Sequence, residues 1–305
     1  MLVSAKTILE KANRGKYAVP AFNVNNMEMI QAIMAGAVQM KSPVILQTTE
    51  GAVRYAGMAY LVAMVQLAAE AHVPVALHLD HGKDIKLIKQ ALEAGYTSVM
   101  IDASDGSFAD NVRLTKLVVE RAHVRKISVE AELGAIVGVE DLVSVSQRDA
   151  HLTSPRLAAD FVRQTGCDCL GVAIGTSHGA YKFKGMPHLD IKRLQEIKKA
   201  VRIPLALHGA SGVPSYIVRL GTKYGAQLGK AQGNSDKEIR AAVRGGINKV
   251  NIDTDLRLAF TAGVRQALAL HKGEFDPRKI LKPARELMTQ VVTEKIKLLG
   301  CGGRA

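Results

Sequence analysis

The sequence contains no tryptophan, only three cysteines and few aromatic residues of any kind. Phe, Trp and Tyr make up 4% of the 305 residues, which leaves little material for a platform on which nucleic-acid bases stack. The cysteines are an odd, sparse set, which argues against a disulfide scaffold and predicts a reducing, cytoplasmic location. Cys167 and Cys169 flank one residue and could bind a metal, but they enter a strand-like run, so buried thiols are the better interpretation.

Long apolar segments are also missing. No run is long enough to cross a bilayer, and the N-terminal stretch lacks the charged, apolar and small-residue sections of a signal peptide, so we expect no membrane association. The net charge of +13 is typical of a protein that binds nucleic acid. However, the basic residues are spread along amphipathic helical patterns beside acidic ones. We therefore expect no nucleic-acid partner and interpret the charge as a field that attracts a small anionic substrate.

Short β-rich runs alternate with amphipathic helical patterns along the whole chain. This alternation predicts parallel strands with right-handed crossovers, and eight such units at this length indicate a closed (β/α)8 TIM barrel rather than an open doubly wound sheet. No Pro/Gly/Ser-rich linker divides the chain, so we expect one α/β domain over residues 1–305, with an extra N-terminal helix and a C-terminal helical extension. The predicted strands are residues 17–23, 43–48, 74–79, 97–102, 127–133, 168–175, 203–208 and 247–252.

Reactive side chains occupy the ends of these predicted strands, where the active site of such a barrel lies. His81, His178 and His208 come from three different strands, and three imidazoles with an open fourth position make a catalytic zinc site. Asp102 and Glu132 lie on two further strands and could hold a second metal position or orient the ligands. One histidine alone would more simply be a hydrogen-bonded core or surface residue, but three at equivalent strand ends favour a metal.

A second group of motifs surrounds the last two strands. Residues 208–212 (HGASG) place glycines with accessible amides after the seventh strand, and residues 251–255 (NIDTD) end the eighth, where a helix begins near Thr254. This is the phosphate site common to many such barrels, although each motif alone also fits an ordinary turn or N-cap. A metal beside a phosphate pocket predicts a phosphorylated substrate, for which aldol chemistry and phosphate-ester hydrolysis both remain open.

Five of these motifs together resemble class II, metal-dependent fructose-bisphosphate aldolases, a family with tagatose-bisphosphate aldolase as a close relative. They are HLDHGKD, EAELG, GTSHGAYK, LHGASG and KVNIDTDLR, and the similarity extends from VPAFNVNN to DPRKILKPA. The resemblance implies reversible cleavage of fructose 1,6-bisphosphate, in glycolysis and gluconeogenesis, to dihydroxyacetone phosphate and glyceraldehyde 3-phosphate through a metal-stabilised enediolate. It also implies Zn²⁺ or another divalent ion such as Co²⁺, a second divalent ion, a monovalent cation, and a homodimer or homotetramer.

The resemblance assigns roles to individual residues. His81, His178 and His208 match the metal ligands, and Asp102 and Glu132 match a second or alternate metal position.

Two residues match the acid/base groups of the family. Asp80 matches the one that exchanges a proton with the C4 hydroxyl. Glu140, on the long loop 134–152, matches the mobile one that handles the C3 proton, with the adjacent Asp141 as an alternative. Arg278 resembles an arginine that reaches the far phosphate, often across a subunit contact. The other predicted substrate-binding positions are Asn23, Thr49, Gly179, Gly209, Ala210, Ser211, Asn251, Ile252, Asp253 and Thr254, of which Asn251 also touches the enediolate.

Other functions compete with this interpretation. A Schiff-base aldolase needs a buried strand lysine, and Lys249 is the candidate, but the histidines would then be unexplained. A metallohydrolase on the same barrel would release phosphate from sugar phosphates. The sequence does not separate fructose from tagatose bisphosphate, which differ at C4, and it assigns no role to the Gly/Gln-rich segment 225–234.

Overall fold

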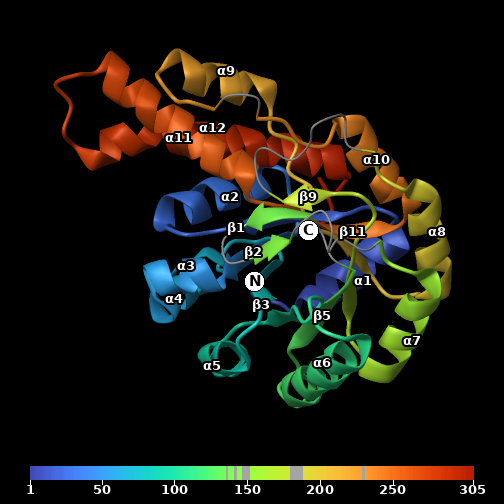
Figure 1. Ribbon diagram of the computed structural model, residues 1–305. Coiled ribbons are helices and arrows are strands. Elements are labelled where there is room, and N and C mark those ends of the chain that lie inside the picture. Colours follow the sequence, from blue (N-terminus) through green and yellow to red (C-terminus); the bar gives the residue numbers. More distant parts are fainter. Residues whose placement is uncertain (135–136, 141–142, 146–151, 179–187, 229–230) are drawn as a thin grey trace.

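Parallel strands close into a barrel, as the alternating pattern predicts (Figure 1). The computed structural model describes residues 1–134, 137–140, 143–145, 152–178, 188–228 and 231–305. The barrel strands are β1 (Val19–Asn23), β2 (Val44–Thr49), β3 (Val75–Gly82), β4 (Ser98–Ile101), β5 (Ser128–Leu133), β8 (Cys169–Val172), β10 (Leu205–Leu207) and β11 (Ile247–Ile252). They pair in the order β1–β11–β10–β8–β5–β4–β3–β2, and β2 returns to β1. The prediction of an eight-stranded TIM barrel is confirmed.

Helices surround this barrel and cover its strands (Figure 1). The predicted extra helix α1 precedes β1, and the predicted C-terminal extension is the long helix α12. The helices are α1 (Ala5–Gly15), α2 (Met27–Gln39), α3 (Glu50–Ala56), α4 (Met58–Ala68), α5 (Ile85–Ala94), α6 (Phe108–His123), α7 (Pro155–Thr165), α8 (Ile191–Ala200), α9 (Ser215–Lys223), α10 (Asp236–Gly245), α11 (Thr254–Leu270) and α12 (Pro277–Leu299).

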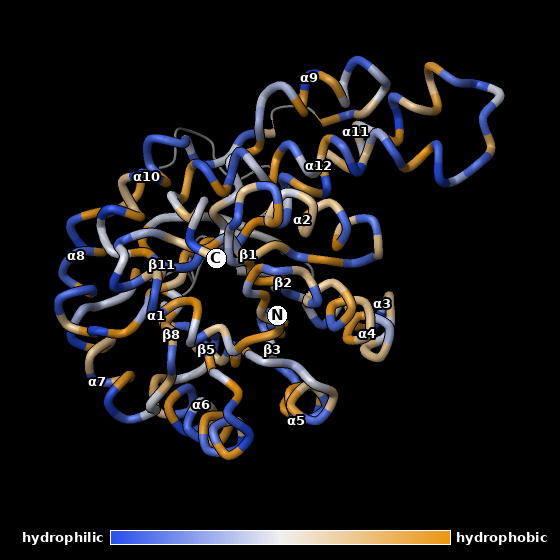
Figure 2. The backbone as a smooth tube through the Cα atoms, turned by 180° about the vertical axis from the view of Figure 1, so that it is seen from behind, coloured by the Kyte–Doolittle hydropathy of each residue, from blue (hydrophilic) through white to orange (hydrophobic). Residues whose placement is uncertain are grey.

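The barrel strands are buried along their whole length. Because helices cover the outside and side chains fill the inside, such strands are apolar on both faces. Polar residues are the informative exceptions, since a buried polar group needs a partner. The surrounding helices alternate between hydrophobic and hydrophilic residues, which matches an outer ring with one face on the barrel and one in solvent (Figure 2).

A small sheet lies over one end of the barrel, in the segments that follow β5 and β8 (Figure 1). It consists of β6 (Val137–Glu140), β7 (Val143–Val145) and β9 (Ser177–His178), with β6 between the other two. Residues 134–152 were expected to form a loop, and residues 177–178 lie beyond the predicted strand 168–175, so these short strands were not predicted. The small sheet stands at the C-terminal ends of the barrel strands, which is the end predicted to hold the site.

Both chain termini lie at the opposite end of the barrel. The N-terminal amino group of Met1 donates to the carbonyls of Ala69, Ala71 and Val73, just before β3. The amide of Ala305 donates to the carbonyl of Lys41, just before β2. The termini therefore pack beneath the barrel and leave the C-terminal strand ends for chemistry.

The helices α11 and α12 form a long antiparallel hairpin that projects beyond the barrel (Figure 1). A Cβ on Gly263 would lie 2.4 Å from Cα of Ala284, so a glycine is needed where these two helices cross. Phe275, near the turn of the hairpin, is 89% exposed. Within the described part of the chain, no single helix has both the length and the apolar character needed to span a membrane, and only α3 and α4, bent by 96°, satisfy these criteria as a pair.

Candidate metal centre and active site

The end of strand β3 carries two adjacent site residues, Asp80 and His81. Alternation along a strand would send His78 and Asp80 into the barrel and His81 to the other face. The pairing of β3 with β4 shifts register between Leu79 and Gly82, and His81 has a φ of 47°, a strained left-handed conformation for a histidine. This irregularity directs both Asp80 and His81 to the mouth of the barrel.

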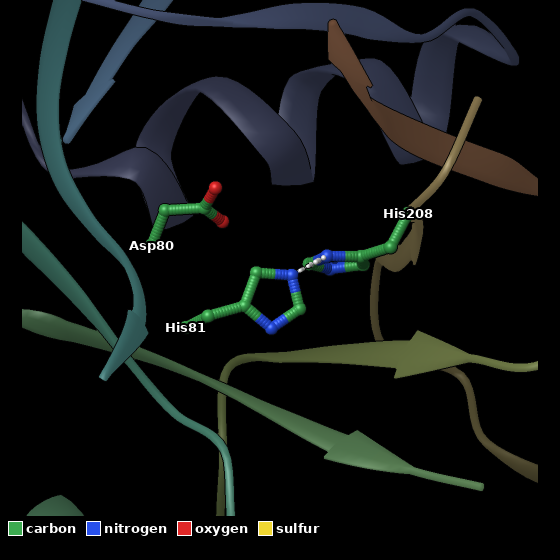
Figure 3. A group of neighbouring side chains, drawn as sticks. All are labelled: Asp80, His81 and His208. Atoms are coloured by element: carbon green, nitrogen blue, oxygen red, sulfur yellow. Dashed lines mark hydrogen bonds between the residues drawn. The ribbon is translucent and has the colours of Figure 1, made fainter. Parts of the chain in front are cut away.

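His81 faces His208, which follows β10, across the mouth (Figure 3). Nε2 of His81 lies 2.9 Å from Nδ1 of His208. The other nitrogen of each ring lies against a carboxylate: Nδ1 of His81 is 2.9 Å from Asp102, and Nε2 of His208 is 2.7 Å from Glu130. A neutral imidazole that donates to a carboxylate has a lone pair on its second nitrogen. The two facing nitrogens therefore call for a cation or a shared proton between them.

Carboxylates complete two groups that could hold a metal around His81. Asp80, His81 and His208 form one group, and His81, Asp102 and Glu132 form the other, with ligand atoms within 4.8 Å of one another in each. Oε2 of Glu132 is buried, has no hydrogen-bond partner among the described residues, and lies 3.6 Å from Nδ1 of His81. A cation would satisfy such an oxygen, and carboxylates behind histidine ligands are usual at metal sites. The residues present thus fit a divalent metal.

Burial and mutual charge shift the ionisation of this cluster in both directions. Burial raises the pKa of Glu132 well above its usual value, and the neighbouring Asp102 raises it further. Burial alone lowers the pKa of His81, but the carboxylates of Asp80, Asp102 and Glu132 outweigh burial and raise it to about 10. Burial lowers the pKa of His208. Positive charge is therefore strongly favoured at His81, among the three carboxylates.

Three amide side chains hold the carboxylate of Asp80. Nδ2 of Asn251 donates to one oxygen at 3.0 Å, while Gln47 and Asn23 donate to the other at 3.0 and 3.1 Å. Burial acts to raise the pKa of Asp80, but the positive charge of its neighbours, led by His81, lowers it overall. An ionised carboxylate at the mouth, fixed in position by these donors, fits a group that accepts a proton.

A buried cation lies deeper in the barrel, beneath the histidines. Nζ of Lys249 is 2.8 Å from Oε2 of Glu130 and 3.5 Å from Nε2 of His78. Burial and then the charge of Lys249 lower the pKa of His78 to about 3, so this imidazole is neutral and hydrogen-bonds to Ser98. Lys249 is fully buried and ion-paired, whereas a Schiff-base lysine must reach the substrate as a free amine. The arrangement argues against the Schiff-base alternative.

The predicted phosphate-binding residues lie together where β10 and β11 end. The amide of Asp253 donates to Oγ of Ser211 at 3.4 Å, so the two segments touch. Arg257, one turn further along α11, binds the carboxylate of Asp253 through Nε at 2.7 Å. The residues that this corner contains are Gly209, Ala210 and Ser211 after β10, and Asn251, Ile252, Asp253 and Thr254 at the junction of β11 with α11.

One detail of the phosphate-loop prediction needs correction. The sequence analysis expects accessible amides along the glycine-containing segment 208–212. In the structure, the amides of Gly212 and Val213 donate to the buried carboxylate of Asp255, at 3.1 and 2.7 Å. These two donors are already used, so any phosphate contacts in this segment fall to the residues before Gly212.

Two further predicted positions have different surroundings. Thr49 ends β2 in register with Asp80 and is buried, and its Oγ1 accepts from the amide of Ala52 at the start of α3. Arg278 lies in the first turn of α12 on the projecting hairpin. Its side chain is 89% exposed, and its Nη2 lies 2.8 Å from Oδ2 of Asp276. The structure therefore places Thr49 at the mouth but does not bring Arg278 into the site of its own chain.

Four predicted positions cannot be fully placed. Gly179 and Asp141 lie outside the described residues, as do the side chains of His178 and Glu140. Backbone pairing nevertheless aligns β9 with β6, with His178 opposite Gly138 and Glu140 ending β6. The segments that carry the predicted third ligand and the loop acid/base thus lie side by side, and both roles stay predictions.

Sequence reasoning missed the residues that support the site rather than form it. Gln47 was a signal that could have been used, because it is a lone amide inside the apolar run 43–48 and shares its face with Thr49. Glu130 was another, since it alternates with Glu132 and therefore faces the same interior. Arg257 and Asp255 gave no signal beyond that of ordinary charged residues at the start of a helix.

Comparisons with known proteins agree with this geometry. The family model described as fructose-bisphosphate aldolase class-II matches residues 3–304. A fructose-bisphosphate aldolase of Thermus caldophilus is 52% identical over 305 residues, and one of Helicobacter pylori is 47% identical over 306, each with both chains fully covered. The crystal structure of the YdjI aldolase from Escherichia coli K12 matches with a TM-score of 0.81 and 34% identity over the whole of both chains. The chain therefore belongs to the class-II fructose-bisphosphate aldolase family.

Proposed function

We propose that this aldolase cleaves fructose 1,6-bisphosphate reversibly into dihydroxyacetone phosphate and glyceraldehyde 3-phosphate. The convergence of Asp80, His81 and His208 at the barrel mouth carries the proposal, because it sets a proton acceptor beside two prospective metal ligands. The relatives at 52% and 47% identity are named for fructose bisphosphate, which favours this sugar over tagatose bisphosphate. Membership of the family favours carbon–carbon cleavage over phosphate-ester hydrolysis.

The metal ligands that we propose are His81, His178 and His208, with Asp102 and Glu132 as a second or alternate position. The family is metal-dependent, and the facing nitrogens of His81 and His208 support the assignment. Imidazole ligands suit zinc, and cobalt is the other candidate. When bound, the ion supplies Lewis-acid polarisation of the substrate carbonyl oxygen. A monovalent cation beside the phosphate loop remains part of the proposal.

Side chains of this protein then move the protons. Asp80 takes the proton of the C4 hydroxyl as the C3–C4 bond breaks, and its three amide donors keep it oriented for this transfer. Nδ2 of Asn251 lies 3.1 Å from Nδ1 of His208. This amide donates a hydrogen bond to the negative charge that develops on the part of the substrate that becomes dihydroxyacetone phosphate. Glu140 delivers a proton to C3. Condensation of the two triose phosphates follows the same steps in reverse.

Phosphate recognition is divided between the corner of β10 and β11 and the hairpin. We assign the dihydroxyacetone phosphate group to Gly179, Gly209, Ala210, Ser211 and residues 251–254. We also assign Asn23 and Thr49 to the sugar hydroxyls, because Asn23 donates to Asp80 and Thr49 pairs in register with Asp80. Because Arg278 is exposed and α12 begins on the hairpin that projects beyond the barrel (Figure 1), its predicted contact with the far phosphate requires a second subunit. We therefore propose a homodimer or homotetramer, and the buried free cysteines suit the cytoplasm.

A coupled cleavage assay on fructose and tagatose bisphosphates, with and without EDTA, tests the function. We expect cleavage of the fructose substrate, loss of that cleavage on complete metal removal, and recovery with zinc or cobalt. A parallel assay for inorganic phosphate separates aldol cleavage from hydrolysis. Full activity of the demetallated protein, or release of inorganic phosphate as the main product, would refute the proposal.

A further inference from the structure

The loop of residues 209–213 is supported from beneath by buried side chains that lie elsewhere in the chain. We propose that Asp255, Lys295 and Asn234 are positioning residues that keep this loop in its phosphate-binding shape. The inference rests on the proposed function, because it takes this loop to bind a substrate phosphate. It also gives a role to two parts of the chain that the reaction leaves unexplained, namely the C-terminal half of α12 and the end of the Gly/Gln-rich segment 225–234.

Asp255 holds the second half of the loop. It lies in the first turn of α11, is fully buried, and accepts the amides of Gly212 and Val213. Val213 has a φ of 50°, a left-handed conformation that is strained for a β-branched residue. Two hydrogen bonds to a charged acceptor are strong enough to hold such a turn. The conformation of the loop therefore depends on the carboxylate of Asp255.

Lys295 supplies the matching positive charge from α12. Its Nζ lies 2.8 Å from Oδ2 of Asp255, and its side chain is only 8% exposed. A Cβ on Gly212 would lie 2.8 Å from this Nζ, so the ammonium group is in direct contact with the loop. Without it, the carboxylate of Asp255 would be buried and unpaired, and its charge would oppose the binding of a phosphate. Lys295 therefore connects the C-terminal helix to anion binding through charge as well as packing.

Asn234 holds the first half of the loop. Its Nδ2 donates to the carbonyl of Gly209 at 2.9 Å, and its amide donates to the carbonyl of Ser211 at 3.2 Å. A Cβ on the preceding Gly233 would lie 2.1 Å from the carbonyl oxygen of Ser211, so only a glycine fits there. Asn234 is 2% exposed. The end of the Gly/Gln-rich segment is thus built against the loop, which explains the small residue at 233.

Phosphate binding to the zinc-loaded and the metal-free protein tests these roles. Isothermal titration calorimetry would give dissociation constants for inorganic phosphate and for dihydroxyacetone phosphate, alongside metal content and KM and kcat for fructose 1,6-bisphosphate. For Lys295→Met we expect both dissociation constants to rise about tenfold or more, with unchanged metal content and a larger effect on KM than on kcat. Lys295→Arg keeps the charge and should recover most of the affinity. Lys297→Met, exposed on the same helix, is the matched control.

A second variant keeps the test decisive if Lys295→Met does not fold. Asn234→Ala removes only the side-chain amide that donates to Gly209 in the first half of the loop. It should weaken phosphate binding in the same way. Wild-type affinity for phosphate in a folded Lys295→Met or Asn234→Ala protein would overturn the positioning roles alone. A wild-type protein that binds neither anion would overturn the phosphate site itself, and with it this inference.

Discussion

Nζ of Lys249 lies 2.8 Å from one oxygen of Glu130, whose other oxygen lies 2.7 Å from Nε2 of His208. Burial alone raises the pKa of Glu130, but Lys249, His208 and His78 together lower it well below its usual value. The ionised carboxylate accepts the Nε2 proton of His208 and so leaves the lone pair of Nδ1 facing the proposed metal position. The lysine that could have suggested a Schiff base thus acts through a carboxylate that orients the proposed metal ligand His208.

Glu130→Gln should weaken metal binding by about ten- to a hundredfold, because the neutral amide no longer holds the tautomer of His208 and leaves Lys249 buried without a counter-charge. The measurement is a zinc titration of the metal-free protein against a competing chelator. Glu120→Gln, exposed on α6, is the control for the loss of one negative charge. Equal zinc affinity in Glu130→Gln and the wild type would contradict the assigned role.

His208→Ala should abolish stable metal occupancy at the mouth of the barrel, because it removes one of the two proposed imidazole ligands that face each other there. Nδ1 of His208 lies 2.9 Å from Nε2 of His81. Metal analysis of the purified protein, after dialysis against a weak chelator, gives the readout. Activity should fall with metal content and should not return on addition of zinc at concentrations that reactivate the metal-stripped wild type. A variant that keeps full occupancy would remove His208 from the ligand set.

Asp80→Ala should lower turnover by about a hundredfold or more, because it removes the proposed proton acceptor for the C4 hydroxyl. Metal content should be largely unchanged, since we assign the metal to histidines even though Asp80 lies within ligand distance of His81 and His208. Steady-state kinetics and metal analysis on the same sample separate the two roles. If zinc were lost along with activity, Asp80 would have to be counted as a ligand.

Gln47→Leu should lower kcat about tenfold while leaving metal content unchanged. The substitution removes Nε2 of Gln47, which donates to Asp80 at 3.0 Å and to Asn23 at 2.7 Å. A hydrogen bond to a charged group contributes about 1.5–3 kcal/mol, which corresponds to about tenfold or more in rate. Thermal unfolding of the same variant measures any general loss of stability. A wild-type kcat in the folded variant would show that Asp80 needs only its other two amide donors.

Local sequence patterns were sufficient for the barrel but not for its mouth. The β-rich runs 43–48 and 247–252 predicted β2 and β11 almost to the residue. The first run is mostly apolar, as expected of a strand that is covered on both faces. The short strands β6 and β9 were missed, since they have few residues and their pairing joins segments some forty positions apart. The helix α3 (Glu50–Ala56) was also not predicted, because its seven residues follow β2 directly and are too few to show a helical period.

In the candidate site, too, some features could be predicted from the sequence and others could not. The rule that reactive residues follow barrel strands predicted Asp80, His81 and His208 from the sequence, and the structure brings their side chains together. The supporting pairs were beyond reach because each joins distant positions: Lys295 meets Asp255 only through the packing of α12 on α11. Periodicity reports which face of an element is buried, but it carries no information about which residue lies opposite.

The ion pair beneath the phosphate loop predicts a specific dependence of stability on pH. Burial alone raises the pKa of Asp255, but Lys295 and the amides of the loop outweigh burial and lower it below its ordinary 3.8. A carboxyl with a depressed pKa stabilises the fold above its unfolded pKa, and that stabilisation is lost as the pH falls toward the folded value. Compared with Asp255→Asn, the metal-free wild type should be about 3 kcal/mol more stable near pH 7. Urea unfolding should show that this difference in unfolding free energy shrinks as the pH falls below 3.8. The control Asp236→Asn, at an exposed position on α10, should show no such pH-dependent difference from the wild type. An advantage that persists or grows in acid would contradict the charged pair.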